Sequence, residues 1–108
     1  MSPLSNMSSN LIGTSYTSTY RILVVEDDRL LRQLITDLLA EVGAETESAA
    51  SGDVAVEQFR QRQASAVHFD VALVDLGVPV VNGVKVLETL RRMDDNIRLV
   101  AMSGADAD

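Results

Sequence analysis

Carboxylate and hydroxyl side chains stand at the ends of three apolar segments of the chain. Glu26, Asp27 and Asp28 directly follow the first segment. Asp75 lies at the end of the second segment, and Ser103 follows the third. Clustered carboxylates repel one another unless a cation lies among them, and oxygen ligands without His or Cys suit Mg²⁺ better than Zn²⁺. An Asp beside Mg²⁺ is a candidate nucleophile for phosphoryl transfer, with the serine hydroxyl as a hydrogen-bond donor to a phosphoryl oxygen.

The elements that position these side chains alternate between strands and helices. Apolar, β-branched runs predict strands at residues 21–25, 70–76 and 97–102, and more weakly at 45–50. Helices are predicted between the strands from three apolar sets: Leu31, Leu34, Ile35, Leu38 and Val42; Val54, Ala55 and Phe59; Val84, Leu87 and Leu90. Asp27 or Asp28 is a candidate cap for the start of the first helix, and Gly43 for its end. The alternation predicts a parallel sheet in the order 2-1-3-4, whose carboxyl edge brings the acids of the first and third strands together.

Composition limits the class of protein. The chain has 108 residues, which is at most one domain, and no cysteine. Nine basic and sixteen acidic residues give a net charge of −7, which argues against direct nucleic-acid binding. No apolar run approaches the roughly 20 residues of a membrane span. Residues 1–20 carry no ionisable side chain and lack the pattern of a secretory signal, so we expect a disordered leader there and a folded domain over 21–108.

Three segments resemble the receiver domain of two-component response regulators: Leu23–Asp28, Asp75–Gly83 and Ala101–Gly104. The resemblance covers residues 21–108. It implies a flavodoxin-like, doubly wound parallel sheet in three α/β/α layers. It also implies a cytoplasmic phosphoacceptor module, not an enzyme acting on a separate substrate. Its phosphoryl donor would be a sensor histidine kinase or a histidine phosphotransfer protein, and no membrane or nucleic-acid partner is expected.

The resemblance also implies a role for individual residues. Asp75 matches the aspartate that accepts the phosphoryl group. Asp27 matches the direct Mg²⁺ ligand, and Glu26 matches its neighbour, which acts through water. The backbone carbonyl of Gly77 matches the third protein ligand, and Ser103 matches the hydroxyl that moves toward the phosphoryl group on activation.

The sequence also departs from the family pattern. Family members continue past this serine through a further helix, a fifth strand ending in Lys-Pro and a last helix, whereas this sequence ends at Asp108, so we expect an incomplete fold with strands 1–4. The single lysine, Lys85, does not match the phosphate-contacting lysine of the family. We expect the segment Ile97–Met102 to be an exposed apolar edge, through which a marginally stable chain self-associates.

Two other classes stay open. One is a degenerate receiver that keeps the acids without switching and acts as a protein-interaction module. The other is an Asp-nucleophile phosphatase of the haloacid-dehalogenase type, although Asp75-Leu-Gly77 lacks the second acid of Asp-x-Asp and the chain is short for a substrate cap. A nucleotide-binding βαβ unit is weaker, because no Gly-x-Gly-x-x-Gly is present. The lone histidine, His68, is expected at the surface.

Overall fold

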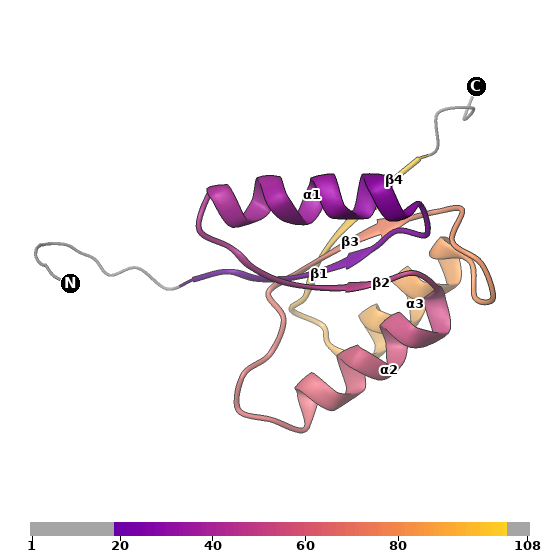
Figure 1. Cartoon of the computed structure of the whole chain (residues 1–108). Coiled ribbons are helices and arrows are strands. Elements are labelled where there is room, and N and C mark those ends of the chain that lie inside the picture. Colours follow the sequence, from indigo (N-terminus) through magenta and orange to yellow (C-terminus); the bar gives the residue numbers. More distant parts are fainter. Residues whose placement is uncertain (1–18, 104–108) are drawn as a thin grey trace, which may run out of the picture.

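Strands and helices alternate through residues 19–103, the part of the chain that the computed structural model describes. The elements are β1 (Arg21–Val25), α1 (Arg29–Glu41), β2 (Glu45–Ala49), α2 (Gly52–Gln63), β3 (Val71–Asp75), α3 (Gly83–Met93) and β4 (Arg98–Met102). The predicted leader lies outside the described residues except for its last two. The four strands are parallel and lie in the order β2-β1-β3-β4, as predicted. One helix, α1, lies over one face of the sheet, and α2 and α3 lie over the other (Figure 1).

The main core lies between the sheet and the α2–α3 layer. β1 is a central strand, and its residues Leu23, Val24 and Val25 are fully buried. On the α2–α3 side, Phe59 stacks on Phe69 with 6.0 Å between the ring centroids. The core cluster joins buried apolar side chains of all these layers: Leu23, Val25, Ala49, Ala55, Phe59, Phe69, Ala72, Val74, Val78, Val86, Leu90 and Ile97. The apolar run of β1 is therefore a strand covered on both faces, as its pattern predicted, whereas β4 is largely exposed.

Local hydrogen bonds fix the helix ends. Asp28 is the N-cap of α1, and its Oδ1 accepts from the amide of Leu31 at 3.0 Å. Gly43 follows the end of α1 with a φ of +90°, the left-handed conformation that glycine adopts without strain. The Gly43 cap was predicted, and Asp28 is the cap of the two candidates, Asp27 and Asp28, that the sequence offered. The carboxamide of Asn82 caps α3 in the same way, because its Oδ1 accepts from the amide of Lys85 at 3.0 Å.

The structure differs from two of the sequence predictions. The apolar stripe predicted for α1 is largely exposed, and no residue of that helix is buried. The last strand is indeed an edge strand of the described sheet, but it begins at Arg98, and the preceding Ile97 is buried in the core. Of the apolar edge that was expected over 97–102, only Val100 and Ala101 are exposed.

Candidate functional site

An acidic cluster lies at the carboxyl end of the two central strands. Val25 of β1 and Val74 of β3 are partners in the parallel register, so the next residues, Glu26 and Asp75, leave the sheet side by side. Asp27 is the residue after Glu26. Each of the three carboxylates has an oxygen within 4.8 Å of an oxygen of the other two. The sheet order thus brings together the acids that the sequence pattern selected.

The three acids differ in burial and in backbone contacts. Glu26 is only 4% exposed, and its Oε2 accepts from the amide of Asp28 at 3.0 Å. Asp27 is exposed. Asp75 is half-buried, and its Oδ1 accepts from the amide of Gly77 at 3.0 Å. One oxygen of Asp75 is therefore held by the loop that follows β3.

Burial raises the pKa of Glu26 above its ordinary value. The hydrogen bond from the amide of Asp28 opposes the rise, whereas the neighbouring Asp75 and Asp27 add to it. A buried carboxylate beside two others is stabilised either by a proton or by a cation. The donor set, three carboxylates without a nitrogen or sulfur ligand, fits a hard divalent ion such as Mg²⁺.

Arg32, which was not among the residues predicted from the sequence, contacts the backbone of Glu26 and Asp27. The Nη1 of Arg32 donates to the carbonyl oxygen of Glu26 at 2.9 Å and approaches that of Asp27 at 3.4 Å. Arg32 lies in the first turn of α1, so it spans only five or six residues to reach these carbonyls. The sequence signal that could have indicated this contact is a basic residue one helical turn after an acidic run.

Two glycines hold the loop between β3 and α3 close to the site. The amide of Gly83 donates to the carbonyl of Leu76 at 3.0 Å, and the amide of Gly52 donates to that of Pro79 at 3.2 Å. A Cβ on Gly83 would lie 2.9 Å from the carbonyl carbon of Asp75, and a Cβ on Gly52 would lie 2.8 Å from a methyl carbon of Val86. Both positions therefore require a residue without a side chain.

A strained residue lies in the middle of this loop. Val80 has a φ of +73°, a left-handed conformation that a β-branched residue rarely adopts. The amide of Val81 donates to the carbonyl of Pro79 at 2.9 Å, which closes a three-residue turn around Val80. The loop is thus fixed at both ends and strained at its centre.

The structure places the remaining predicted site residues at the same edge of the sheet. Met102 is the register partner of Asp75, so the exposed Ser103 follows at the end of β4. Gly77 contacts Asp75 through its N–H, while the predicted role of its carbonyl stays a prediction. Lys85 is exposed in the first turn of α3, and His68 is exposed, as expected.

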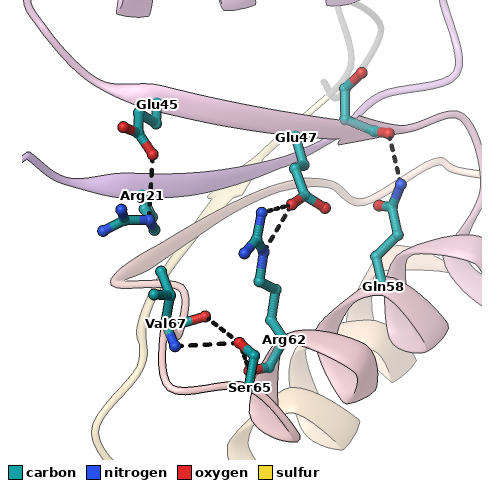
Figure 2. Close-up of polar contacts among 8 residues, drawn as sticks. Arg21, Glu45, Glu47, Gln58, Arg62, Ser65 and Val67 are labelled. Atoms are coloured by element: carbon teal, nitrogen blue, oxygen red, sulfur yellow. Dashed lines mark hydrogen bonds and ion pairs between the residues drawn. The ribbon is translucent and has the colours of Figure 1, made fainter.

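The ion pairs of the described residues lie elsewhere. Arg21 pairs with Glu45 at 3.2 Å, and Arg62 contacts Glu47 through two nitrogens, one of them Nε at 2.7 Å (Figure 2). The third pair, Arg60 with Glu57, lies on α2. None of these three pairs includes a residue of the acidic cluster.

Comparison with known proteins identifies the fold. The sequence model of the response regulator receiver domain matches residues 22–108. The alkaline phosphatase synthesis transcriptional regulatory protein SphR of Synechococcus elongatus is 32% identical over 92 residues, covering 82% of this chain. The sporulation initiation phosphotransferase F of Bacillus subtilis is 28% identical over 83 residues, covering 77% of this chain. The chain spans 36% of the length of the first relative and 63% of the second.

Solved structures support the same assignment. The response regulator protein TrrA of Thermotoga maritima, crystallised in complex with Mg²⁺ and BeF, superposes with a TM-score of 0.73 at 25% identity, over 82% of this chain and 72% of that one. A CheY-like receiver domain of Methanospirillum hungatei also gives a TM-score of 0.73, at 24% identity, over 83% of this chain and 68% of that one. The fold is therefore flavodoxin-like, as predicted. No helix among residues 19–103 is long and apolar enough to cross a membrane. The chain belongs to the response regulator receiver domains of two-component signalling.

Proposed function

We propose that Asp75 is the phosphoacceptor of this receiver domain and that the reaction depends on Mg²⁺. The observation that carries the proposal is the grouping of Glu26, Asp27 and Asp75 oxygens within 4.8 Å of one another at the carboxyl end of β1 and β3. The Mg²⁺–BeF complex of TrrA, a similar protein, supports it. Glu26, through water, and Asp27 would hold the ion together with Asp75 and the carbonyl of Gly77. When bound, Mg²⁺ would neutralise charge on the phosphoryl oxygens.

The proposed step transfers a phosphoryl group from nitrogen to oxygen. The amide of Gly77 holds Oδ1 of Asp75 at 3.0 Å, so Oδ2 is the proposed nucleophile. Oδ2 forms the new bond to phosphorus while the bond from phosphorus to the donor histidine nitrogen breaks, and the electron pair returns to the imidazole. The product is an acyl phosphate on Asp75. The hydroxyl of Ser103 donates a hydrogen bond to one of its oxygens.

The proposed donor is a sensor histidine kinase or a histidine phosphotransfer protein. Two relatives have names that refer to phosphoryl transfer, an autoinducer sensor kinase/phosphatase of Vibrio harveyi and a sporulation initiation phosphotransferase of Bacillus subtilis, which supports a phosphoryl-transfer role for this chain. The phosphorylated state would then be read by a partner protein or an output domain. In this scheme the chain is a regulatory phosphoacceptor, and the only chemistry it performs is on its own side chain.

One observation favours a second candidate, a degenerate receiver that binds partners without switching. The only lysine of the chain is Lys85. It is exposed in the first turn of α3, and it does not lie at the end of a strand. Among residues 19–103, none of the four strands ends at a lysine. The two candidates differ in whether an adduct forms at Asp75.

Intact-mass spectrometry distinguishes these candidates. The chain is incubated with Mg²⁺ and acetyl phosphate, beside the variants Asp75→Asn and Asp37→Asn. Asp37 is an exposed acid on α1 and serves as the matched control. We expect one adduct of about 80 Da in the wild type and in Asp37→Asn, none in Asp75→Asn, and none when Mg²⁺ is chelated. A folded wild-type chain without an adduct would contradict the phosphoacceptor role in this segment and favour the second candidate.

A further inference from the structure

One pair of neighbouring residues at the start of α3 has chemistry that the proposed function does not use. Asn82 and Gly83 form the only Asn-Gly sequence in the chain. Asparagine is thermally labile, because the backbone nitrogen of the next residue attacks its carboxamide carbon, and a glycine there carries no side chain to obstruct the attack. The other asparagines, Asn6, Asn10 and Asn96, precede Met, Leu and Ile. Asn82 is therefore the asparagine of this chain most prone to lose its amide.

Two hydrogen bonds engage the reacting groups in the folded chain. Gly83 is buried, and its N–H donates to the carbonyl of Leu76 at 3.0 Å, so the nitrogen keeps its proton. The Oδ1 of Asn82 accepts from the amide of Lys85 at 3.0 Å, which turns the carboxamide toward α3. For the attack, the nitrogen must lose its proton and the carboxamide must turn back toward it. Both bonds therefore have to break before the reaction starts.

The bond between Gly83 and Leu76 depends on the loop between β3 and α3. This loop is held to α2 by the bond from the amide of Gly52 to the carbonyl of Pro79, at 3.2 Å. The centre of the loop is strained, since Val80 has a φ of +73°. Release of the Gly52 contact would let the loop relax this strain, at a lower cost than unfolding the sheet. Local opening with the sheet intact is therefore a route to the reactive state.

We propose that Asn82 deamidates spontaneously and that opening of the loop between β3 and α3 sets the rate. In the open state the nitrogen of Gly83, after giving its proton to hydroxide, bonds to Cγ of Asn82, and the carboxamide nitrogen leaves as ammonia. Water then opens the resulting succinimide ring at one of its two carbonyl carbons. One opening gives aspartate, and the other gives isoaspartate, in which the main chain runs through the former side chain. Water is consumed, ammonia is released, and the chain gains a carboxylate.

The two products should affect the candidate site differently. An aspartate at residue 82 keeps an acceptor oxygen for the amide of Lys85 and remains a good helix cap. Isoaspartate adds a methylene group to the main chain directly before Gly83. Gly83 is closely packed, because even a Cβ on it would lie 2.9 Å from the carbonyl carbon of Asp75. Isoaspartate should therefore displace the backbone of Asp75 and slow its phosphorylation, a consequence that rests on the proposed function, whereas the deamidation does not.

Peptide mapping by mass spectrometry tests the proposal on the 108-residue chain. The chain is aged at mildly alkaline pH, folded in buffer and unfolded in guanidinium chloride, and the peptide with residue 82 is scored for a gain of about 1 Da. We expect deamidation in both samples, at least about tenfold slower in the folded chain because of the two hydrogen bonds. The peptide with Asn96, which precedes Ile97, is the internal control and should stay intact. Equal rates in the two samples would overturn the proposal, and so would a folded chain that does not react.

Two glycine variants separate opening of the loop from unfolding of the whole chain. A Cβ on Gly52 would press against the carbonyl oxygen of Val81 and lie 2.8 Å from a methyl carbon of Val86, so Gly52→Ala should push the loop open. Gly43→Ala is the matched control, since its φ of +90° is unfavourable for alanine but nothing lies within 4 Å of the added Cβ. We expect Gly52→Ala to speed deamidation of the folded chain about tenfold, equivalent to about 1.4 kcal/mol of opening, and Gly43→Ala to leave the rate unchanged. Equal acceleration by both variants would mean that the reaction needs global unfolding, which is contrary to the proposal.

Two further measurements complete the test. Where circular dichroism shows Gly52→Ala to be unfolded, the wild type is aged in denaturant below its unfolding transition; loop opening exposes little surface, so the rate should rise with denaturant much less steeply than the global unfolding constant. Equal slopes would contradict loop opening. Aged chains with isoaspartate, separated by chromatography, should form the Asp75 adduct about tenfold more slowly than Asn82→Asp chains, and equal rates would refute the effect on the site. A fresh chain that forms no adduct would contradict the proposed function and leave the deamidation result standing.

Discussion

Replacement of Gly83 by alanine tests whether the loop after β3 positions Asp75. A methyl group on residue 83 would press against the carbonyl oxygen of Asp75 and the Cα of Leu76, and would lie 2.9 Å from the carbonyl carbon of Asp75. Ordinary van der Waals contact begins at 3.4 Å, so the backbone has to move by at least 0.5 Å. The atoms that must give way are backbone atoms at the end of β3, which cannot rotate aside as a side chain would.

The expected cost follows from this overlap. Inserting a methyl group into a well-packed place costs about 1–3 kcal/mol. Alanine favours a helix over glycine by up to about 1 kcal/mol, which offsets part of that cost because residue 83 begins α3. The net loss in the free energy of unfolding should be about 1–2 kcal/mol. Because the backbone of Asp75 itself is displaced, the rate of phosphorylation should fall about 10- to 100-fold.

Urea unfolding and the initial rate of adduct formation from acetyl phosphate measure the two effects. Gly43→Ala is the matched control. Gly43 also resists a side chain, through its φ of +90°, but nothing lies within 4 Å of the added Cβ, and the residue is at the other end of the sheet from the acids. It should lose about 1 kcal/mol of stability and none of the phosphorylation rate. A Gly83→Ala chain with wild-type stability and rate would refute the role assigned to this loop.

Three further changes test separate features of the site. Val80→Asn should raise the free energy of unfolding by about 1 kcal/mol in urea, because asparagine tolerates the left-handed φ of +73° better than valine. Burial raises the pKa of Glu26 above its ordinary 4.5, so the contribution of Glu26 to the free energy of unfolding is fully present below pH 4.5 and is lost as pH rises through the higher folded-state pKa. In the presence of a chelator, Glu26→Gln should remove this pH-dependent loss of stability. An identical profile of stability against pH for both chains would contradict this expectation. Arg32→Met removes the hydrogen bond to the carbonyl of Glu26, and it should cost about 1 kcal/mol and raise the Mg²⁺ concentration that gives half-maximal phosphorylation.

The sequence predicted those features that follow from local periodicity and from parallel-sheet geometry. A continuous apolar run between amphipathic segments has few alternatives to a parallel strand, so β1, β3 and β4 lie where they were expected, within a few residues. The polar β2 has no such run and was predicted only weakly. Asp28 supplies an acceptor side chain at the start of α1, and Gly43 adopts the left-handed conformation that follows its end, so both caps are present. Because β1 lies next to β3 and Val25 pairs with Val74, Glu26 and Asp75 are necessarily close to each other.

Features that depend on long side chains or on loop closure were not predictable in this way. Arg32 follows the acidic run by one turn, but its flexible side chain leaves open in the sequence which acceptor it contacts, here the carbonyl of Glu26. The left-handed Val80 has no sequence signal, because valine disfavours that conformation; it results from the two backbone bonds that close the loop at Gly52 and Gly83. The spacing of the α1 stripe predicts that the helix has an apolar side, but not which surface covers that side, and here the described residues leave it open.

Phosphorylation should not depend on the exposed side chains of α1, and this independence is testable. The acids are positioned by β1, β3, the amide of Gly77 and the loop bonds. Leu38 lies toward the end of α1 that is remote from the acids, since α1 begins at Arg29, next to the acidic run. We therefore expect Leu38→Lys to form the Asp75 adduct at the wild-type rate. A folded Leu38→Lys chain that fails to form the adduct would contradict this account of how the site is positioned, because residue 38 is remote from the acids.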